Sequence, residues 1–435
     1  MTRGSGLSLR HPGLRVPRHR ATTAQLGAIY TVPADAQSDG HGVFVGVDQA
    51  AGGAPFFFEP FQAYRDETIT APNVLVLGEI GSGKSSAVKT FLYRASLLAG
   101  PNGRRRFIAI LDPKGEYAPL AEALALPRVL LRPGGIDRLN PLAATAGTSD
   151  VADDTARRAS VALALAGATL GRELTAIEEA GVGWAAAALS GTAAPTLPDL
   201  VGLLASPTTV MADAAARPAA ELARDVADVR LALAKLCDRQ LRGMLDGRST
   251  VTLDRSGRGL VVDLSALYHD HDALNVVMIA VSAWLQALLA TPTAQAQGLQ
   301  AYQVWDECWA LTARVQSARY MQASLKLARA YGITNIAVTH RIADLRAQSE
   351  DGSAAAKVSQ GLLADAQVRV LFRQPSDQVP EAQRALGLTS REAEALPTLP
   401  RGRALWKLPR YATFVDHLIG PDERPLCDTD ARLAI

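Results

Sequence analysis

The feature that most constrains this chain is a glycine-rich loop, GEIGSGKS, at residues 78–85. An apolar run at residues 74–77 precedes it, and a stretch with helical spacing begins near Ser86. Glycines let successive backbone N–H groups turn toward bound phosphates, and the N-terminus of a following helix adds partial positive charge. The pattern therefore predicts a nucleotide site between a strand and a helix, which indicates an α/β fold.

Each residue of this loop has an expected role. Lys84 is expected to reach the β- and γ-phosphates, and the Ser85 hydroxyl is expected to bind Mg²⁺. The nucleotide is expected to contact Gly78, Gly81, Ser82, Gly83, Lys84, Ser85 and Ser86.

The composition is that of a globular, helix-rich protein. Of 435 residues, 48% are hydrophobic and only 5% aromatic, and the net charge is +2. This length allows two or three cores, or one large α/β domain with an insertion. The widely separated Cys237, Cys308 and Cys427 fit neither a disulfide framework nor a CxxC metal site, which favours a reducing cytosol. No continuous apolar segment follows the basic N-terminus, which argues against a signal peptide.

Four segments are predicted along the chain. Residues 1–40 are interpreted as a flexible basic arm, which is either solvated or held electrostatically by anionic lipid or DNA. Residues 41–142 and 251–435 are expected to form the first and second parts of a P-loop ATPase domain. Residues 143–250 are Ala-rich with helical periodicity and are interpreted as an all-α insertion. Its role stays open between structural support, a lid, a substrate-engaging module and a subunit contact.

Alternating strand and helix patterns extend on both sides of this insertion. The segment 273–290 is apolar, but Asn275, Ser282 and Gln286 favour a buried helix over a membrane span. A helix is also expected over 380–395. Strands are expected at residues 42–48, 56–58, 74–77, 107–111, 129–131, 260–264, 302–307, 336–341, 366–372 and 404–408, the last two being the final strands of the sheet.

Three of the expected strands end in aspartate, at Asp112, Asp263 and Asp306, and only Asp306 is followed directly by glutamate. In a P-loop NTPase, one acid at a strand end holds the Mg²⁺ shell, partly through water, and a neighbouring carboxylate deprotonates the attacking water. We therefore assign the metal role to Asp306 and the base role to Glu307. The alternative is that this pair caps the helix that follows.

A second polar strand end lies at Thr339-His340-Arg341. A strand beside the phosphate strand would place His340 where it can sense the γ-phosphate, because an imidazole can donate to a phosphate oxygen or to the attacking water. The alternative is a packed loop histidine.

Taken together, these motifs resemble the ATPase domain of conjugation and type IV secretion motors, the VirB/TraC-like family within the FtsK/HerA superfamily. The resemblance covers about residues 42–420. The motifs that carry it are residues 78–85, DPKGEY at 112–117, NPL at 140–142, WDE at 305–307, and RAYG at 329–332 leading to Thr339-His340.

The resemblance implies a RecA-like, mainly parallel sheet of the ASCE type, ATP hydrolysis with Mg²⁺, and hexameric rings. In such rings an arginine from the neighbouring subunit reaches the γ-phosphate. Arg329 matches the position of that arginine, with Arg341 as the second candidate. The implied partners are membrane-embedded channel proteins and a translocated protein or DNA. The implied location is the cytoplasm, with peripheral attachment at the inner face of the cell membrane as a variant.

The function expected from these features is an ATP-driven motor that energises translocation through, or assembly of, a type IV secretion or conjugation apparatus. Two alternatives stay open. One is an FtsK/HerA-like DNA translocase, although the chain beyond its basic arm is slightly acidic, so that any grip on DNA would be local. The other is an assembly switch in which ATP binding sets the conformation and turnover is incidental.

Overall fold

The part of the chain described by the computed structural model excludes the predicted basic arm at residues 1–40. The proposed contacts of that arm with lipid or DNA therefore lie outside the described residues. The structure describes residues 41–98, 103, 106–143, 151–192, 194–238, 241–251, 257–289, 298–312, 314–345 and 354–428.

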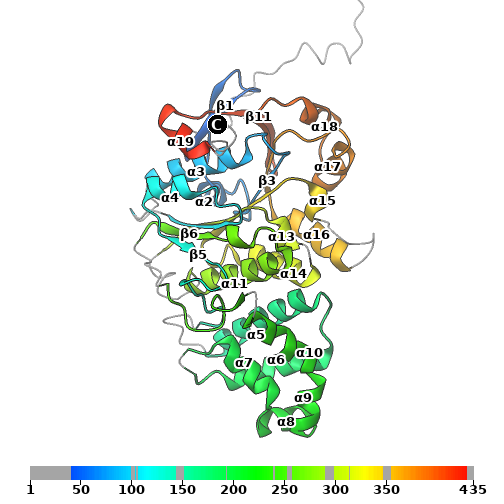
Figure 1. The fold of residues 1–435 in the computed structure, drawn as a ribbon. Helices are drawn as coiled ribbons and strands as arrows, with labels where there is room; N and C mark the ends of the chain where they lie inside the picture. Colours follow the sequence, from blue (N-terminus) through cyan, green and yellow to red (C-terminus); the bar gives the residue numbers. More distant parts are fainter. Residues whose placement is uncertain are drawn as a thin grey trace, which may run out of the picture.

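The centre of the fold is one mixed sheet of eleven described strands (Figure 1). The strand that carries the glycine loop lies inside its parallel part, and β8 separates it from β7, the strand that precedes Asp306. The parallel strands are, in order across the sheet, β9 (Val368–Leu371), β3 (Val74–Leu77), β8 (Ile333–Thr339), β7 (Ala301–Trp305), β4 (Phe107–Asp112), β6 (Gly259–Asp263) and β5 (Arg128–Leu130).

An antiparallel edge extends the sheet beyond β9. It consists of β10 (Arg403–Lys407), β11 (Ala412–His417), β1 (Val43–Asp48) and β2 (Ala54–Phe58). The prediction that the sheet ends at 404–408 is therefore wrong, because β11 follows after a short turn. In β11 only Thr413 and Val415 are buried, so its apolar alternation is too weak to be recognised from the sequence.

Helices cover both faces of the sheet because successive strand residues point to opposite sides. The even-numbered residues of β3 pack in a core with α3 (Lys84–Leu97) and α4 (Ala118–Leu124), and the odd-numbered residues pack in a core with α11 (His271–Leu289) and α14 (Val315–Leu327). The other helices beside the sheet are α2 (Pro60–Arg65), α13 (Trp309–Thr312), α15 (Ile342–Leu345), α16 (Ala354–Asp365), α17 (Val379–Leu386), α18 (Ser390–Ala395) and α19 (Arg424–Cys427).

Helices are found in both of the segments where the sequence predicts them, 273–290 and 380–395. The predicted helix over 380–395 is divided into α17 and α18, because Gly387 caps α17 in the left-handed conformation and Thr389 starts α18 with a capping box. The apolar helix α11 packs in the core, as expected for 273–290. Along the described chain, no helix combines the length and the apolar character that a membrane crossing requires.

In the described chain between β5 and β6, the long regular elements are helices, joined by turns and loops. Figure 1 shows its helices gathered at one end of the molecule, where α5 lies next to α11 and α14. The boundaries 143–250 for an inserted unit stay a prediction. The helices are α5 (Val151–Leu170), α6 (Ala176–Ala188), α7 (Leu197–Ala205), α8 (Thr209–Ala215), α9 (Ala219–Asp225) and α10 (Ala227–Leu236).

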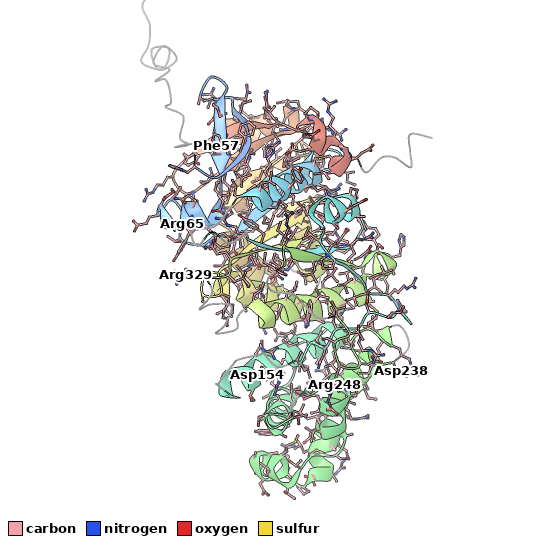
Figure 2. All side chains as sticks on the ribbon, turned by 90° about the vertical axis from the view of Figure 1, so that its left-hand side faces the viewer. Phe57, Arg65, Asp154, Asp238, Arg248 and Arg329 are labelled. Atoms are coloured by element: carbon pink, nitrogen blue, oxygen red, sulfur yellow. The ribbon has the colours of Figure 1, made fainter. Side chains whose placement is uncertain are left out.

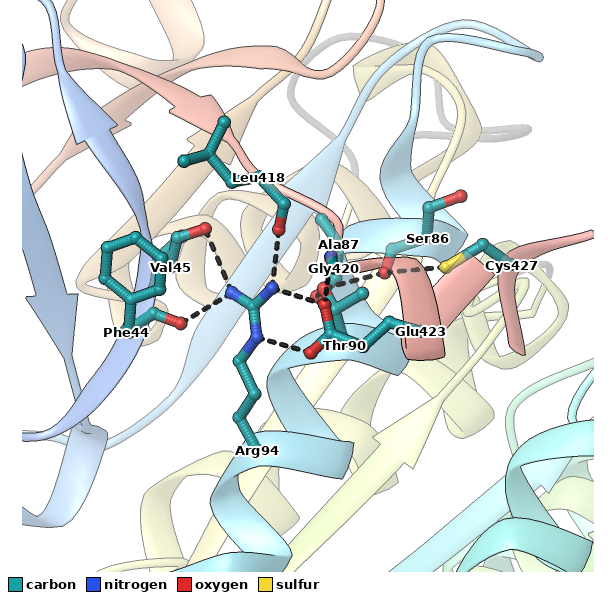
Figure 3. A network of polar contacts seen from close by, with 10 residues as sticks. All are labelled: Phe44, Val45, Ser86, Ala87, Thr90, Arg94, Leu418, Gly420, Glu423 and Cys427. Carbon is teal, nitrogen blue, oxygen red and sulfur yellow. Dashed lines mark hydrogen bonds and ion pairs between the residues drawn. The ribbon is translucent and has the colours of Figure 1, made fainter. Parts of the chain in front are cut away.

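Arg94, near the C-terminal end of α3, ties this helix to the antiparallel edge (Figure 3). Its guanidinium donates to the carbonyl oxygens of Phe44 at 2.8 Å and Leu418 at 2.6 Å, and to a carboxylate oxygen of Glu423 at 2.6 Å. Charge-assisted bonds of this kind are about twice as strong as neutral ones. The helix that follows the glycine loop is therefore anchored at its far end.

His417, at the end of β11, supports the glycine loop through a second contact. Its Nδ1 donates to the Gly402 carbonyl at 3.1 Å, and its Nε2 accepts from the Trp406 indole at 3.3 Å. The Gly402 N–H donates in turn to the Ser82 carbonyl at 2.9 Å. Both contacts of the ring require a neutral imidazole with its proton on Nδ1. Burial lowers the pKa of His417 to about 4.

Protonation of His417 is expected to destabilise the fold in mild acid. Because its pKa in the folded chain lies below the unfolded value of about 6.5, stability falls as the pH drops from about 6.5 toward 4. At pH 5 this pKa difference corresponds to a loss of at most about 2 kcal/mol. Urea unfolding at pH 7.5 and pH 5 measures how much the free energy of unfolding falls between the two pH values. This fall should be smaller for His417→Gln than for the unaltered chain. An equal loss in both proteins would contradict this role.

Candidate active site

The glycine loop has the geometry of an anion cradle. Gly81 and Gly83 have φ angles of 76° and 111°, in the left-handed region that favours glycine. At Gly78 an added Cβ would lie 2.6 Å from the Cβ of Phe372. No side chain caps the N-terminus of α3, so the backbone N–H groups of its first turn can serve a ligand. These features fit a bound phosphate.

Lys84 lies inside this loop and is 6% exposed. Its Nζ donates to the carbonyl oxygens of Gly78 at 2.5 Å and Glu79 at 2.9 Å, and it lies 3.1 Å from Nδ1 of His340. Burial lowers the pKa of Lys84 to about 8, although the nearby carboxylates of Glu307 and Asp306 act in the opposite direction. A phosphate would compensate this buried cation better than neutral carbonyl groups do.

His340 connects Lys84 to Glu307. An ammonium only donates, so Nδ1 of His340 accepts from Lys84, and Nε2 then donates to Oε1 of Glu307 at 2.9 Å. Three predicted site residues from distant parts of the chain thus lie in one line of hydrogen bonds. The geometry places His340 beside both the phosphate lysine and the expected base.

Glu307 is held by further contacts on both carboxylate oxygens. Its Oε1 forms an ion pair with Lys114, and its Oε2 accepts from the Trp309 indole. Burial acts to raise its pKa, but the hydrogen bonds from His340 and Lys114 outweigh burial and hold the pKa of Glu307 at about 2. Its φ of 51° is rare for a residue other than glycine. Glu307 is therefore an ionised, oriented acceptor on a strained backbone.

Two of the three strand-end aspartates are engaged by their own surroundings. The carboxylate of Asp112 accepts from the backbone N–H groups of Glu116 at 3.0 Å and Tyr117 at 2.9 Å. Asp263 forms an ion pair with Arg128 at 2.7 Å. The contacts of Asp112 close the turn after β4, and the ion pair of Asp263 ties β6 to its neighbour β5, so both aspartates have structural roles.

Asp306 has a different environment. It is 3% exposed and accepts from the Glu307 N–H at 3.2 Å. Burial, followed by the charge of Glu307, raises the pKa of Asp306 to about 8, and a cation beside it would favour the ionised form.

A magnesium ion fits these surroundings only together with a nucleotide. Among the described residues, no group of three or more His, Cys, Asp or Glu side chains could hold a metal ion. Mg²⁺ commonly takes one or two protein ligands and completes its shell with phosphate oxygens and water. Asp306, and Ser85 in the first turn of α3, suit such a shared shell, and their metal roles stay predictions.

Arg329 lies at the amino-terminal ends of the parallel strands, whereas the glycine loop lies at their carboxyl-terminal ends. It is exposed and precedes β8, and Figure 2 shows it at the surface of the molecule. The loop follows β3, which is parallel to β8, and the seven residues of β8 span about 20 Å. Arg329 therefore does not reach the loop of its own chain. Arg341 follows β8, so it lies at the same end of the parallel strands as the loop.

Sequence reasoning missed three residues of this site: Lys114, Trp309 and Arg373. Lys114 follows β4, which is a neighbour of β7, and Arg373 follows β9, which is a neighbour of β3. For Lys114 and Arg373 the available signal was a charged residue two positions after a strand, whereas Trp309 carried no such signal. The signal could not be used without the order of the strands, because that order decides which loops meet.

Arg373 neutralises an acid within the glycine loop. Its guanidinium Nε donates to the carboxylate of Glu79, and the Glu79 N–H donates to the Arg373 carbonyl at 3.0 Å. An uncompensated carboxylate in this loop would repel phosphates. The ion pair therefore keeps the loop suited to an anion.

Loss of Arg373 is expected to weaken nucleotide binding because it leaves the charge of Glu79 beside the phosphates. Arg373→Ala should raise the Kd for Mg·ATP about tenfold, corresponding to roughly 1.4 kcal/mol. The double variant Glu79→Ala/Arg373→Ala should return to within about twofold of the unaltered chain. Titration with a fluorescent ATP analogue measures both. A double variant that binds as weakly as Arg373→Ala would indicate instead that Arg373 contacts the nucleotide directly.

Comparison with known proteins finds solved structures with a similar fold. No family model and no curated protein matches the chain. The structure is similar to VirB4 of Thermoanaerobacter pseudethanolicus, with a TM-score of 0.68 and 19% identity over 89% of this chain and 99% of that one. It is also similar to the plasmid coupling protein TrwB in complex with the ATP analogue ADPNP, with a TM-score of 0.56 and 15% identity over 92% and 93% of the two chains. These likenesses show that the chain has the α/β P-loop NTPase fold that the sequence predicts.

Proposed function

We propose that this chain is an ATP-hydrolysing motor that energises substrate translocation through, or assembly of, a type IV secretion or conjugation apparatus. The observation that carries the proposal is the line of contacts from Lys84 through His340 to Glu307, beside the buried Asp306. The likeness to TrwB supports it, because TrwB is a bacterial conjugative coupling protein with structures in complex with ADP and Mg²⁺. We therefore assign ATP and Mg²⁺ to this site.

The chain's own residues supply the steps of hydrolysis. Lys84 exchanges its carbonyl partners for the phosphates and stabilises charge on the transferring group. Ser85 and Asp306 would hold Mg²⁺, which would neutralise phosphate charge. Glu307 accepts a hydrogen bond from the attacking water and takes its proton.

His340 is proposed as the sensor of the γ-phosphate. Its Nδ1 faces Lys84 and its Nε2 donates to Glu307. When Lys84 bonds to a phosphate, Nδ1 loses its partner, and the ring can turn or exchange a proton. Binding of phosphate at Lys84 would thus change the hydrogen bonding of Glu307 through the His340 side chain.

The active form is proposed to be a homo-oligomer, a hexameric ring in which Arg329 completes the site of a neighbour. The support is its position, since it is exposed and lies at the edge of the sheet away from its own loop. Arg341 remains the second candidate. Such a ring would act in the cytoplasm at the inner face of the cell membrane, against a membrane-embedded channel, on a protein or DNA substrate.

Replacement of the base separates a motor from a nucleotide-binding switch. Glu307→Gln should keep Mg·ATP binding within about threefold and lower turnover by a factor of about 10² to 10⁴, because only proton removal is lost. Lys84→Ala should weaken binding as well. Phosphate release and nucleotide titration measure the two effects.

The matched control is Glu392→Gln, because Glu392 is also a shielded glutamate paired with a lysine, Lys407, at 2.8 Å. It should leave turnover unchanged. A Glu307→Gln chain that hydrolyses ATP within twofold of the unaltered chain would contradict the assignment of the base.

A further inference from the structure

The ion pair between Lys114 and Glu307 has no role in the mechanism above. We propose that Lys114 is a positioning residue for hydrolysis, which holds the Glu307 carboxylate in the orientation that meets the attacking water. This inference rests on the proposed ATPase function and deepens it.

Lys114 reaches Glu307 because their strands are neighbours. β4 and β7 pair in parallel, with Leu111 opposite Trp305, so the residues that follow the two strands lie side by side. The side chain of Lys114 is 23% exposed and that of Glu307 is 4% exposed. A pair shielded to this degree is screened far less by salt than a surface pair.

The backbone that carries Lys114 is fixed on both sides. Asp112 accepts hydrogen bonds from the N–H groups of Glu116 and Tyr117, which close the turn around Lys114. Gly115 makes this turn possible with a φ of 71°. The Lys114 ammonium also lies 5.9 Å from the centre of the Tyr268 ring, a cation–π distance. A lysine held in this way can orient its partner.

The contacts of Glu307 leave one position for a water. An ionised carboxylate offers about four lone-pair sites. Lys114 and His340 take two sites on Oε1, and Trp309 takes one on Oε2. The fourth site, on Oε2, is the one we assign to the attacking water.

Lys114 differs from His340 in how it acts on the phosphate lysine: its charge acts on Lys84 from a distance, whereas His340 contacts Lys84 directly. His340 also contacts Lys84, and Lys84 is expected to change partners when phosphate binds. Lys114 pairs with Glu307 and faces Tyr268, so nothing in its surroundings requires it to move with the nucleotide. It therefore holds Oε1 throughout the reaction, while His340 responds to the phosphate.

The test compares kcat and KM, because loss of a positioning residue lowers kcat and leaves KM unchanged. Lys114→Met keeps the apolar stem and removes the charge, and it should lower kcat about 10- to 100-fold, with KM and the Kd for Mg·ATP within about threefold. Lys114→Arg should recover most of the loss. The matched control is Lys407→Met, because the Lys407–Glu392 pair is similarly shielded, at 20% and 14% exposure, and lies outside the site. The control should keep its kcat.

A double-mutant cycle tests whether Lys114 acts through Glu307. In the Glu307→Gln background, Lys114→Met should cost nothing further, because the carboxylate it positions is gone. An equal loss in both backgrounds would overturn the proposal, and so would an unchanged kcat in Lys114→Met. A raised KM and Kd with unchanged kcat would make Lys114 a phosphate ligand instead.

Folding and the proposed function are tested separately from this role. Unfolding midpoints of Lys114→Met and Lys114→Arg within a few degrees of the unaltered chain show that the variants fold, and if Lys114→Met does not fold, Lys114→Gln replaces it. An unaltered chain that binds Mg·ATP without turnover would overturn the ATPase function and this role together. Normal turnover in the unaltered chain with no effect of Lys114→Met would overturn this role alone.

Discussion

The buried ammonium of Lys84 is the interaction on which the rest of the site depends. A cation at 6% exposure is costly unless it is surrounded by acceptors. Loop carbonyls and Nδ1 of His340 meet this need, and the negative charge of Glu307 acts on Lys84 from nearby. Since His340 also holds Glu307, and Glu307 pairs with Lys114, the segments after β3, β8, β7 and β4 form one connected network.

The sheet makes this network possible because the carboxyl ends of its parallel strands lie side by side. Chain segments that are far apart in the sequence thereby meet, as Lys84 and His340 do across 256 positions. The antiparallel edge adds support from the side, where Arg94 anchors α3 and His417 contacts Gly402, which bonds to Ser82 of the loop. The fold thus supplies a rigid frame, and the nucleotide is expected to change only the partners of Lys84 and His340.

Local signals explain what could be predicted from the sequence. The glycine loop is recognisable because its glycines, Lys84 and the flanking strand and helix are adjacent in the chain. Asp306 and Glu307 are recognisable because two acids directly follow an apolar strand. The surroundings of Lys114 and Arg373 were not predictable in this way, because their partners depend on which strands are neighbours. The strand β11 was missed because only two of its side chains are buried. That Arg329 and the loop lie at opposite ends of the strands also could not be predicted, because it depends on the parallel pairing of β3 and β8.

The carboxyl ends of the parallel strands are proposed to form an ATPase site that a neighbouring chain completes. The most direct measurement is phosphate release by an equimolar mixture of Arg329→Ala and Glu307→Gln chains, each inactive alone. In a head-to-tail ring, random mixing joins an intact Glu307 to a neighbour's intact Arg329 at about a quarter of the interfaces. Turnover should recover to about that fraction of the value for the unaltered chain. No recovery in mixtures that are shown by pull-down to co-assemble would contradict it.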